Sequence, residues 1–198
     1  MSLRLAGIAD TRRLAELHAT RITEGFLPSL GPAFLDRLYR RIVRSEGSFA
    51  YVVADNRDGH VQGYAAATAD LGALYREFAL RDGVFAAAVA APRLARSWRR
   101  VLETVRYPAG DGADLPDAEI LSVAVEPEAA GHGIGRLVVD AATRRLADRG
   151  ERAIKVVAGS DNTAALRLYE RCGYAAHSRV EVHEGVTSQV LVWNSSSR

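Results

Sequence analysis

Three glycines stand at alternate positions, Gly131, Gly133 and Gly135, between an apolar run and a segment of helical composition. A glycine-rich turn that leads from a strand into a helix lets several backbone N–H groups converge on one point, where the helix dipole adds partial positive charge. Phosphate is the natural ligand of such a turn. A tight turn without any ligand also needs glycine, and for one isolated Gly-x-Gly that alternative stays open.

Two common nucleotide-binding motifs fail on spacing. The dinucleotide fingerprint G-x-G-x-x-G requires a further glycine where this sequence has Arg136 or Val138. It also requires the turn to follow its strand directly, whereas residues 126–130 intervene here. The phosphate loop of NTPases requires Gly-Lys-Ser/Thr, and the only lysine, Lys155, lies elsewhere.

A third pattern fits two segments. The run VEPEAAGHGIGRLVVDAA (125–142) resembles the acetyl-CoA signature of the GNAT acetyltransferase superfamily, in which a strand ending Val-x-Pro precedes Q/R-x-x-G-x-G/A and an amphipathic helix. DNTAALRLYERCGY (161–174) resembles its next motif, Asn-x-x-Ala-x-x-Leu-Tyr-x-x-x-Gly-Phe/Tyr. The segment LRLAGIADTRRLAELH resembles the usual entry strand and helix, so the resemblance covers nearly all of the chain except 71–118.

One position departs from the acetyl-CoA signature. Ala130 stands where the family usually has Gln or Arg. Because the family binds the pyrophosphate mostly through backbone N–H groups, we expect weaker cofactor binding rather than none. Arg136, just inside the helix, could supply the missing charge, or it could be an ordinary solvated helix arginine.

The resemblance implies acetyl-CoA as co-substrate, with no metal. It assigns the thioester carbonyl and the pantetheine arm to the backbone of Val123 and Val125. It assigns the rest of the cofactor to the glycine loop and the start of the following helix, namely Gly131, His132, Gly133, Ile134, Gly135 and Arg136, and to Asn162 of the second motif.

Tyr169 and Glu119 are the catalytic candidates that the resemblance implies. Asn162, Leu166 and Tyr169 share one helix face, and the family places this tyrosine near the cofactor sulfur. A phenol with a pKa of about 10 can protonate a departing thiolate when it is well positioned, although a core tyrosine is the alternative.

A general base is useful because an alkylamine is almost wholly protonated at pH 7. Glu119 stands at the start of the central strand, where such enzymes often carry a glutamate, or it is a solvated strand end. Glu126 and His183 are weaker candidates for the base. We interpret Cys172 as a packing residue.

The hydrophobic pattern predicts a mixed α/β fold. Strand, helix and strand within 119–158 form a crossover unit with two parallel strands, and hairpins flank it on both sides. Helices are predicted from about Ile134 to Asp148 and from about Thr163 to Cys172, and Asp10 and Pro32 mark the starts of two others. The expected architecture is a GNAT-like twisted mixed sheet of about seven strands with helices on both faces.

Composition bounds the other possibilities. The 198 residues suit a single domain, and a net charge of +2 gives no argument for nucleic acid. One cysteine allows no intrachain disulfide, and no apolar run is long enough for a membrane span, so we expect a cytoplasmic protein.

Residues 71–107 have helical composition, with Pro92 as a break, and occupy a place where the family has a short connection. Four arginines in this helical insertion share a helical spacing with Trp98 among them, namely Arg93, Arg96, Arg99 and Arg100. They could receive an anionic acceptor, or they form a solvated face.

The sequence thus predicts transfer of acetyl from acetyl-CoA to a primary amine of a small molecule, by direct attack in a ternary complex. Protein N-terminal or lysine acetylation is one alternative, and a non-catalytic acyl-CoA-binding module is the other. A homodimer is an expectation from the resemblance alone.

Overall fold

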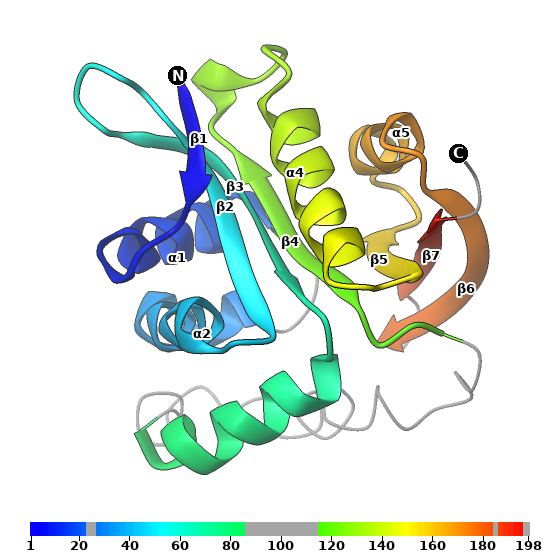
Figure 1. Cartoon of the computed structure of the whole chain (residues 1–198), viewed down its shortest axis with the longest axis horizontal. Coiled ribbons are helices and arrows are strands. Elements are labelled where there is room, and N and C mark those ends of the chain that lie inside the picture. The colour runs from blue at the N-terminus through cyan, green and yellow to red at the C-terminus, as the bar shows by residue number, and fades with distance from the viewer. Residues whose placement is uncertain (23–26, 86–114, 184–185, 196–198) are drawn as a thin grey trace.

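A seven-stranded sheet organises the chain (Figure 1). The computed structural model describes residues 1–22, 27–85, 115–183 and 186–195. The strand order is β1-β2-β3-β4-β5-β7-β6, with β4 and β5 parallel and every other neighbouring pair antiparallel. The strands are β1 (Ser2–Leu5), β2 (Ser48–Ala54), β3 (Val61–Thr68), β4 (Glu119–Val125), β5 (Ala153–Gly159), β6 (Ala175–His183) and β7 (Val186–Asn194). The predicted mixed sheet is confirmed.

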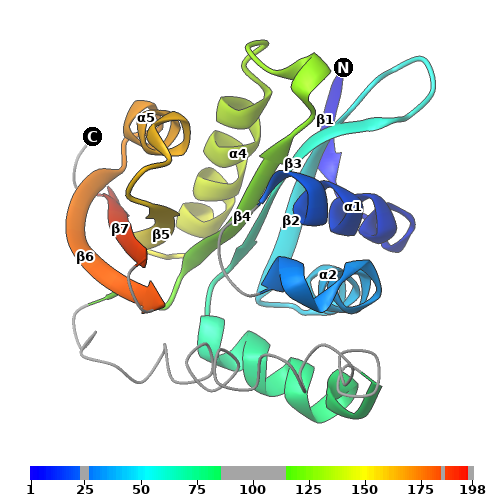
Figure 2. The ribbon, with the colours of Figure 1, turned by 180° about the vertical axis from the view of Figure 1, so that it is seen from behind.

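Helices cover both faces of the sheet. The helices α4 (Ile134–Asp148) and α5 (Thr163–Arg171) lie on one face, and α1 (Thr11–Arg21) and α2 (Pro32–Arg44) lie on the other (Figures 1 and 2). Pro32 occupies the first turn of α2, where its missing N–H costs no helical hydrogen bond. Short 3-10 turns, η1 (Ile8–Asp10), η2 (Leu27–Leu30) and η4 (Pro127–Ala129), connect these elements.

Each face has its own hydrophobic core. Beneath α4, the residues Val138, Val139 and Leu146 pack on Ile120 and Ile154 of the sheet. On the opposite face, the core combines residues of α1 and α2 with β2 and β3, namely Leu14, Leu17, Leu35, Leu38, Val52 and Tyr64. Strand residues therefore alternate between two cores, as buried sheet strands must.

A β-bulge in β4 changes this alternation. Ala67 pairs with Ile120 and Ala66 with Ser122, so Leu121 is an extra residue. Ala118 and Ile120, before the bulge, belong to the core beneath α4, whereas Ser122, after it, contacts Tyr39 of α2. Even-numbered residues of β4 therefore face α4 before the bulge and face α1 and α2 after it.

Residues 71–85 form a helix that is joined to α2 by ion pairs. The Asp82 carboxylate forms ion pairs with two arginines of α2, with Arg37 Nε at 2.5 Å and Arg41 Nε at 2.7 Å. Phe34 of α2 also packs edge-on against Phe78. The start of the predicted helical insertion is therefore helical. Its remainder, with Pro92 and the four arginines around Trp98, lies outside the described residues.

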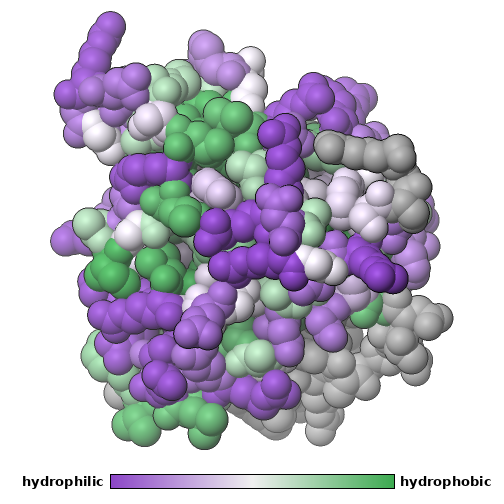
Figure 3. Space-filling model, in the orientation of Figure 1, coloured by the Kyte–Doolittle hydropathy of each residue, from purple (hydrophilic) through white to green (hydrophobic). Residues whose placement is uncertain are grey.

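The surface over α4 and α5 is mostly hydrophilic, with smaller apolar areas between (Figure 3). Leu137 of α4 is an exposed apolar residue, with an exposed fraction of 45%. Over the described ranges, no helix combines the length and the apolar character that a bilayer span requires. Over the same ranges, no three His, Cys, Asp or Glu side chains are grouped so that they could hold a metal ion.

Candidate active site

A groove of about 570 Å³ lies between the end of β4, the glycine loop and α5. Seven of the nine predicted cofactor residues line it, namely Val123, Val125, Gly131, Gly133, Ile134, Gly135 and Arg136. The lining of α5 comes from Ala164, Ala165, Leu168 and Arg171. Its place at the carboxyl end of β4 is where open α/β sheets bind ligands.

The glycine loop has backbone conformations that favour glycine. Gly131 and Gly133 both have a φ of 79°, in the left-handed region, and Gly133 is the N-cap of α4. An added Cβ at either glycine would meet no atom within 4 Å. Leu137 N donates to the carbonyl of the N-cap residue Gly133, so the N–H groups of residues 134–136 precede this helical hydrogen bond. These donors at the positive end of α4 suit an anion such as a pyrophosphate.

Gly135 serves packing as well. A Cβ at this position would lie 3.3 Å from Leu168 Cδ2, so α4 and α5 approach closely at the groove. The glycine at this position lets the two helices form adjacent walls.

The backbone of β4 carries donors toward the side of β5. Glu126 N donates to Gln62 O at the end of β3, and N–H groups alternate in direction along a strand. Val123 N and Val125 N therefore point away from β3. Pairing between β4 and β5 comprises only Glu119 with Lys155 and Ile120 with Val156, so these N–H groups have no strand opposite. The bulge at Leu121 produces this arrangement.

Two predicted cofactor residues, His132 and Asn162, do not line the groove, and the side chain of Arg136 has a partner of its own. Ala130 lines the groove, whereas His132 does not and places its Nδ1 3.0 Å from Ala130 O. Arg136 lies 3.5 Å from Asp140 on the exposed side of α4. The Asn162 side chain accepts a hydrogen bond from Ala165 N at 3.1 Å and so caps α5.

Tyr169 lies on α5 with its side chain in the core, and its exposed fraction is 6%. Its ring packs edge-on to Tyr174, with 6.0 Å between the ring centroids. Neighbouring α5 residues Leu168 and Ala165 line the groove, while Tyr169 itself does not. The phenol of Tyr169 is therefore next to the groove in sequence, beside the lining residue Leu168, but it lies in the core and not in the groove wall.

Glu119 and Lys155 form a buried ion pair at the start of β4. Glu119 Oε2 lies 3.4 Å from Lys155 Nζ, and Lys155 also donates to the carbonyl of Pro116. Burial raises the pKa of the Glu119 carboxyl, and the Lys155 ammonium opposes that rise. Glu119 does not line the groove. The sequence did not lead us to predict Lys155 as the partner of Glu119. A single lysine inside the apolar segment AIKVVAG nevertheless indicates a buried charge that needs a partner.

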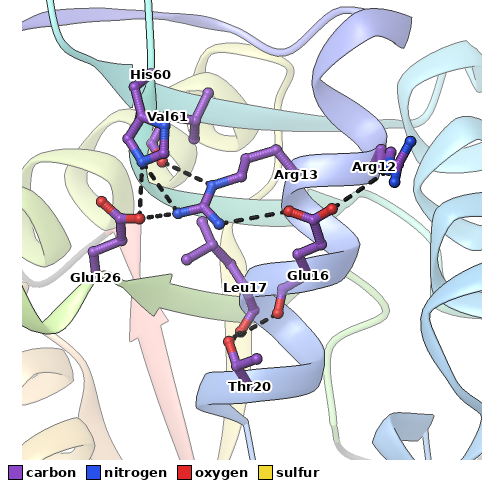
Figure 4. A network of polar contacts seen from close by, with 8 residues as sticks. All are labelled: Arg12, Arg13, Glu16, Leu17, Thr20, His60, Val61 and Glu126. Atoms are coloured by element: carbon purple, nitrogen blue, oxygen red, sulfur yellow. Dashed lines mark hydrogen bonds and ion pairs between the residues drawn. The ribbon is translucent and has the colours of Figure 1, made fainter.

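Glu126, a weaker candidate for the base, is held in a network of charged side chains (Figure 4). Arg13 of α1 pairs with its carboxylate and donates to Val61 O at 3.3 Å, and His60 Nε2 lies 2.9 Å from the same carboxylate oxygen. This network ties α1 and the β2–β3 hairpin to the end of β4. The carboxylate of Glu126 therefore has two charged or polar partners already. The side chain of His183 lies outside what the structure describes.

A buried polar network follows the bulge on the α1/α2 face. Tyr39 Oη lies 2.6 Å from His18 Nδ1, 2.5 Å from Tyr64 Oη and 2.9 Å from Ser122 Oγ. A phenol donates one hydrogen bond and accepts two, so at least two of these partners donate to Tyr39. Sequence analysis missed this network because its members are far apart in the chain, although a serine inside the apolar run EILSVAV was a hint.

His18 makes the stability of this network dependent on pH. Burial lowers the pKa of His18 from 6.5 to about 4, so between these values the unfolded chain binds more protons than the folded one. Stability should therefore fall as the pH drops from about 6.5 to about 4, by about 3 kcal/mol from this group. Urea unfolding of wild type and of His18→Asn at pH 7.5 and pH 4.5 measures this loss of unfolding free energy. The variant should lose less stability at low pH, and an equal loss in both proteins contradicts the assignment.

Cys172, interpreted as a packing residue, is half-buried and packs against the core beneath α4. Burial and the neighbouring Asp140 carboxylate raise the pKa of the thiol to about 12. A thiol with such a pKa is a poor nucleophile at neutral pH.

The comparisons with known proteins agree with this geometry. The sequence model of the Acetyltransferase (GNAT) family matches residues 13–174, and the chain belongs to that family. Among curated relatives, a mycothiol acetyltransferase of Geodermatophilus obscurus is 33% identical over 85 residues, which are 43% of this chain and 26% of that protein. The chain thus spans about a quarter of the length of that relative.

Solved structures share the fold. A point mutant of spermidine N-acetyltransferase SpeG from Vibrio cholerae has a TM-score of 0.62 at 16% identity, covering 99% of this chain and 96% of that one. The NatC complex bound to Gag peptide and CoA contains a chain with a TM-score of 0.60 at 16% identity, covering 98% of this chain and 97% of that one.

Proposed function

We propose that this chain is an N-acetyltransferase that transfers acetyl from acetyl-CoA to a primary amine of a small molecule. The observation that carries the proposal is the groove, in which a left-handed glycine turn, the start of α4 and two outward N–H groups of β4 lie together. The anion-binding turn suits a pyrophosphate, and the strand donors suit the amides and thioester of an extended arm. When bound, acetyl-CoA supplies the activated acyl group.

Each proposed residue has a separate task in a direct transfer. The N–H groups of Val123 and Val125 orient the arm and stabilise negative charge that develops on the carbonyl oxygen. Glu119 takes the proton of the attacking ammonium or amine, acting through water because it lies four residues from Val123, about 13 Å along the strand. Tyr169 donates its phenolic proton to the departing thiolate.

Two facts favour a small molecule as the acceptor. The relatives' names include mycothiol acetyltransferase and spermidine N-acetyltransferase. In addition, the helix 71–85 lies beside α2, on the face to which Glu119 points, and encloses that face further. Acetylation of a protein N-terminus is the second candidate, since the NatC complex shares the fold. A non-catalytic acyl-CoA-binding module is the third candidate, because Ala130 replaces the usual Gln or Arg of the acetyl-CoA signature.

Thermal unfolding with and without acetyl-CoA tests the cofactor first, with NADH and ATP as controls. A ligand at a hundred times its Kd adds about 2.7 kcal/mol of stability, which shifts the Tm by several degrees in a domain of this size. A selective shift justifies a screen of amines and N-terminal peptides for thiol release. Equal shifts with all three nucleotides, or none with millimolar acetyl-CoA, would contradict the proposal, and binding without any turnover would favour the binding module.

A further inference from the structure

Lys155 is the only lysine of the chain, and it lies inside an otherwise apolar strand. Its exposed fraction is 7%. Burial of an ammonium is costly unless the charge is paired and hydrogen-bonded, so a lysine here needs a specific reason. Its two partners are Glu119 and the carbonyl of Pro116, which is next to the first described residue after the helical insertion.

The pair has a defined place in the sheet. Ile154 and Val156 face the core beneath α4, so Lys155 between them faces the α1/α2 side. Glu119, between Ala118 and Ile120, faces the same side by the same alternation. Their residues are register partners at the only stretch where β4 and β5 pair. Lys155 therefore lies where the two strands part, next to the proposed base.

The carboxyl of Glu119 has an oxygen available for a proton. Its Oε2 is buried and has no hydrogen-bond partner among the residues that the structure describes. Lys155 Nζ lies 3.4 Å away, a contact of charges rather than a hydrogen bond. A carboxylate in this situation is kept ionised by a cation and still accepts a proton.

Other charged groups are farther from the pair or have their own partners. Across β4, the register partner of Glu119 on β3 is the uncharged Thr68. Asp117, two residues before Glu119, is exposed. On α2, Arg41 is paired with Asp82 and Glu77. Within the part of the chain that the structure describes, Lys155 is the charged side chain that pairs with Glu119.

Resting on the proposed role of Glu119, we propose that Lys155 is a positioning residue that keeps the Glu119 carboxylate ionised and oriented for proton removal from the acceptor amine. Loss of its charge should raise the pKa of Glu119 by about one unit or more, since an opposite charge at this distance lowers a carboxyl pKa by about 1–3 units. The acid limb of the pH–rate profile should move to higher pH by the same amount.

A uniquely labelled lysine gives the direct test. With ¹³C,¹⁵N-lysine the protein yields one side-chain Cε–Nζ signal, because Lys155 is the only lysine. In wild type this signal should shift in one step as Glu119 titrates, and in Glu119→Gln the step should vanish. A step that persists in Glu119→Gln, or a flat signal in wild type from pH 4 to pH 9, overturns the proposal. This measurement needs neither a Lys155 variant nor an acceptor.

Variants supply the second arm. ¹³C-carboxyl-labelled glutamate, with Glu119 assigned from Glu119→Gln, reports the midpoint in Lys155→Gln and in the charge-preserving control Lys155→Arg. In Lys155→Gln the titration midpoint of Glu119 should rise by about one pH unit, which is a tenfold higher proton affinity. In Lys155→Arg it should stay near the wild-type value. An unchanged midpoint in a folded Lys155→Gln protein rejects the proposal.

The pH profile of kcat/KM in the same variants separates the two claims. If the NMR midpoint moves while the acid limb does not, Glu119 is not the base and the proposed function loses that residue, whereas the coupling to Lys155 stands. If both move together, both claims are supported.

Discussion

Tyr169→Phe should lower kcat by about 10²- to 10⁴-fold while acetyl-CoA still binds, because the change removes the proton donor proposed for the thiolate. The ring stays in its place against Tyr174, so the helix α5 that forms the groove wall keeps its packing. Steady-state kinetics and the Tm shift with acetyl-CoA measure the two properties separately.

Tyr174→Phe is the matched control. Its hydroxyl is also buried but is bonded to Thr143 of α4 at 2.8 Å, and burial raises the pKa of this phenol well above 10. Loss of that hydrogen bond should cost about 1 kcal/mol of stability and leave kcat nearly unchanged. If the two variants lower kcat equally, or if Tyr169→Phe turns over at the wild-type rate, Tyr169 is not the acid.

Gly133→Val should abolish the stabilisation by acetyl-CoA. The valine must adopt a φ of 79°, and its side chain would project into the groove beside the N–H groups of α4. Each hydrogen bond to a charged group contributes about 1.5–3 kcal/mol, so displacing the pyrophosphate from even two donors should raise Kd at least 10²-fold. Titration calorimetry with acetyl-CoA measures the change.

Gly150→Val controls for backbone strain. Gly150 has a φ of 100° and open space around its Cβ position, but it lies in the turn after α4, at the end opposite to the groove. Both variants should lose a similar amount of stability, about 1–2 kcal/mol. Only Gly133→Val should lose acetyl-CoA, and an equal loss of affinity in Gly150→Val would assign the effect to strain instead.

Local signals in the sequence were enough for the crossover unit. The structure has α4 at Ile134–Asp148 and β5 at Ala153–Gly159, the same residues that the periodicity and the flanking glycines predicted. The apolar patterns LRLAGI, SRVEVHE and TSQVLVW predict the first strand and the last two. The structure makes β1 shorter than its pattern and makes β6 and β7 longer than theirs. Edge strands are set by pairing with a neighbour, which a local pattern does not contain.

The site was predictable where one segment builds it and not where several do. The loop Gly131–Arg136 and the donors of β4 come from one continuous stretch, so the resemblance of that stretch to the acetyl-CoA signature was enough to group them. The Glu119–Lys155 pair and the hydroxyls around Tyr39 join residues 25 and more positions apart, through strand register and helix docking. A bulge also reverses the facing of every residue after it, and no residue type in LSVAV signals that reversal.

The bulge at Leu121 gives one strand two independent duties. Before it, β4 contributes Glu119 to the side where an acceptor is proposed, and after it, the same strand turns the N–H groups of Val123 and Val125 toward the groove. Side chains around Glu119 can therefore vary with the acceptor while the cofactor's donors, being backbone, stay unchanged. A family that keeps one acyl donor and changes its amines needs such a division, and here a single extra residue provides it.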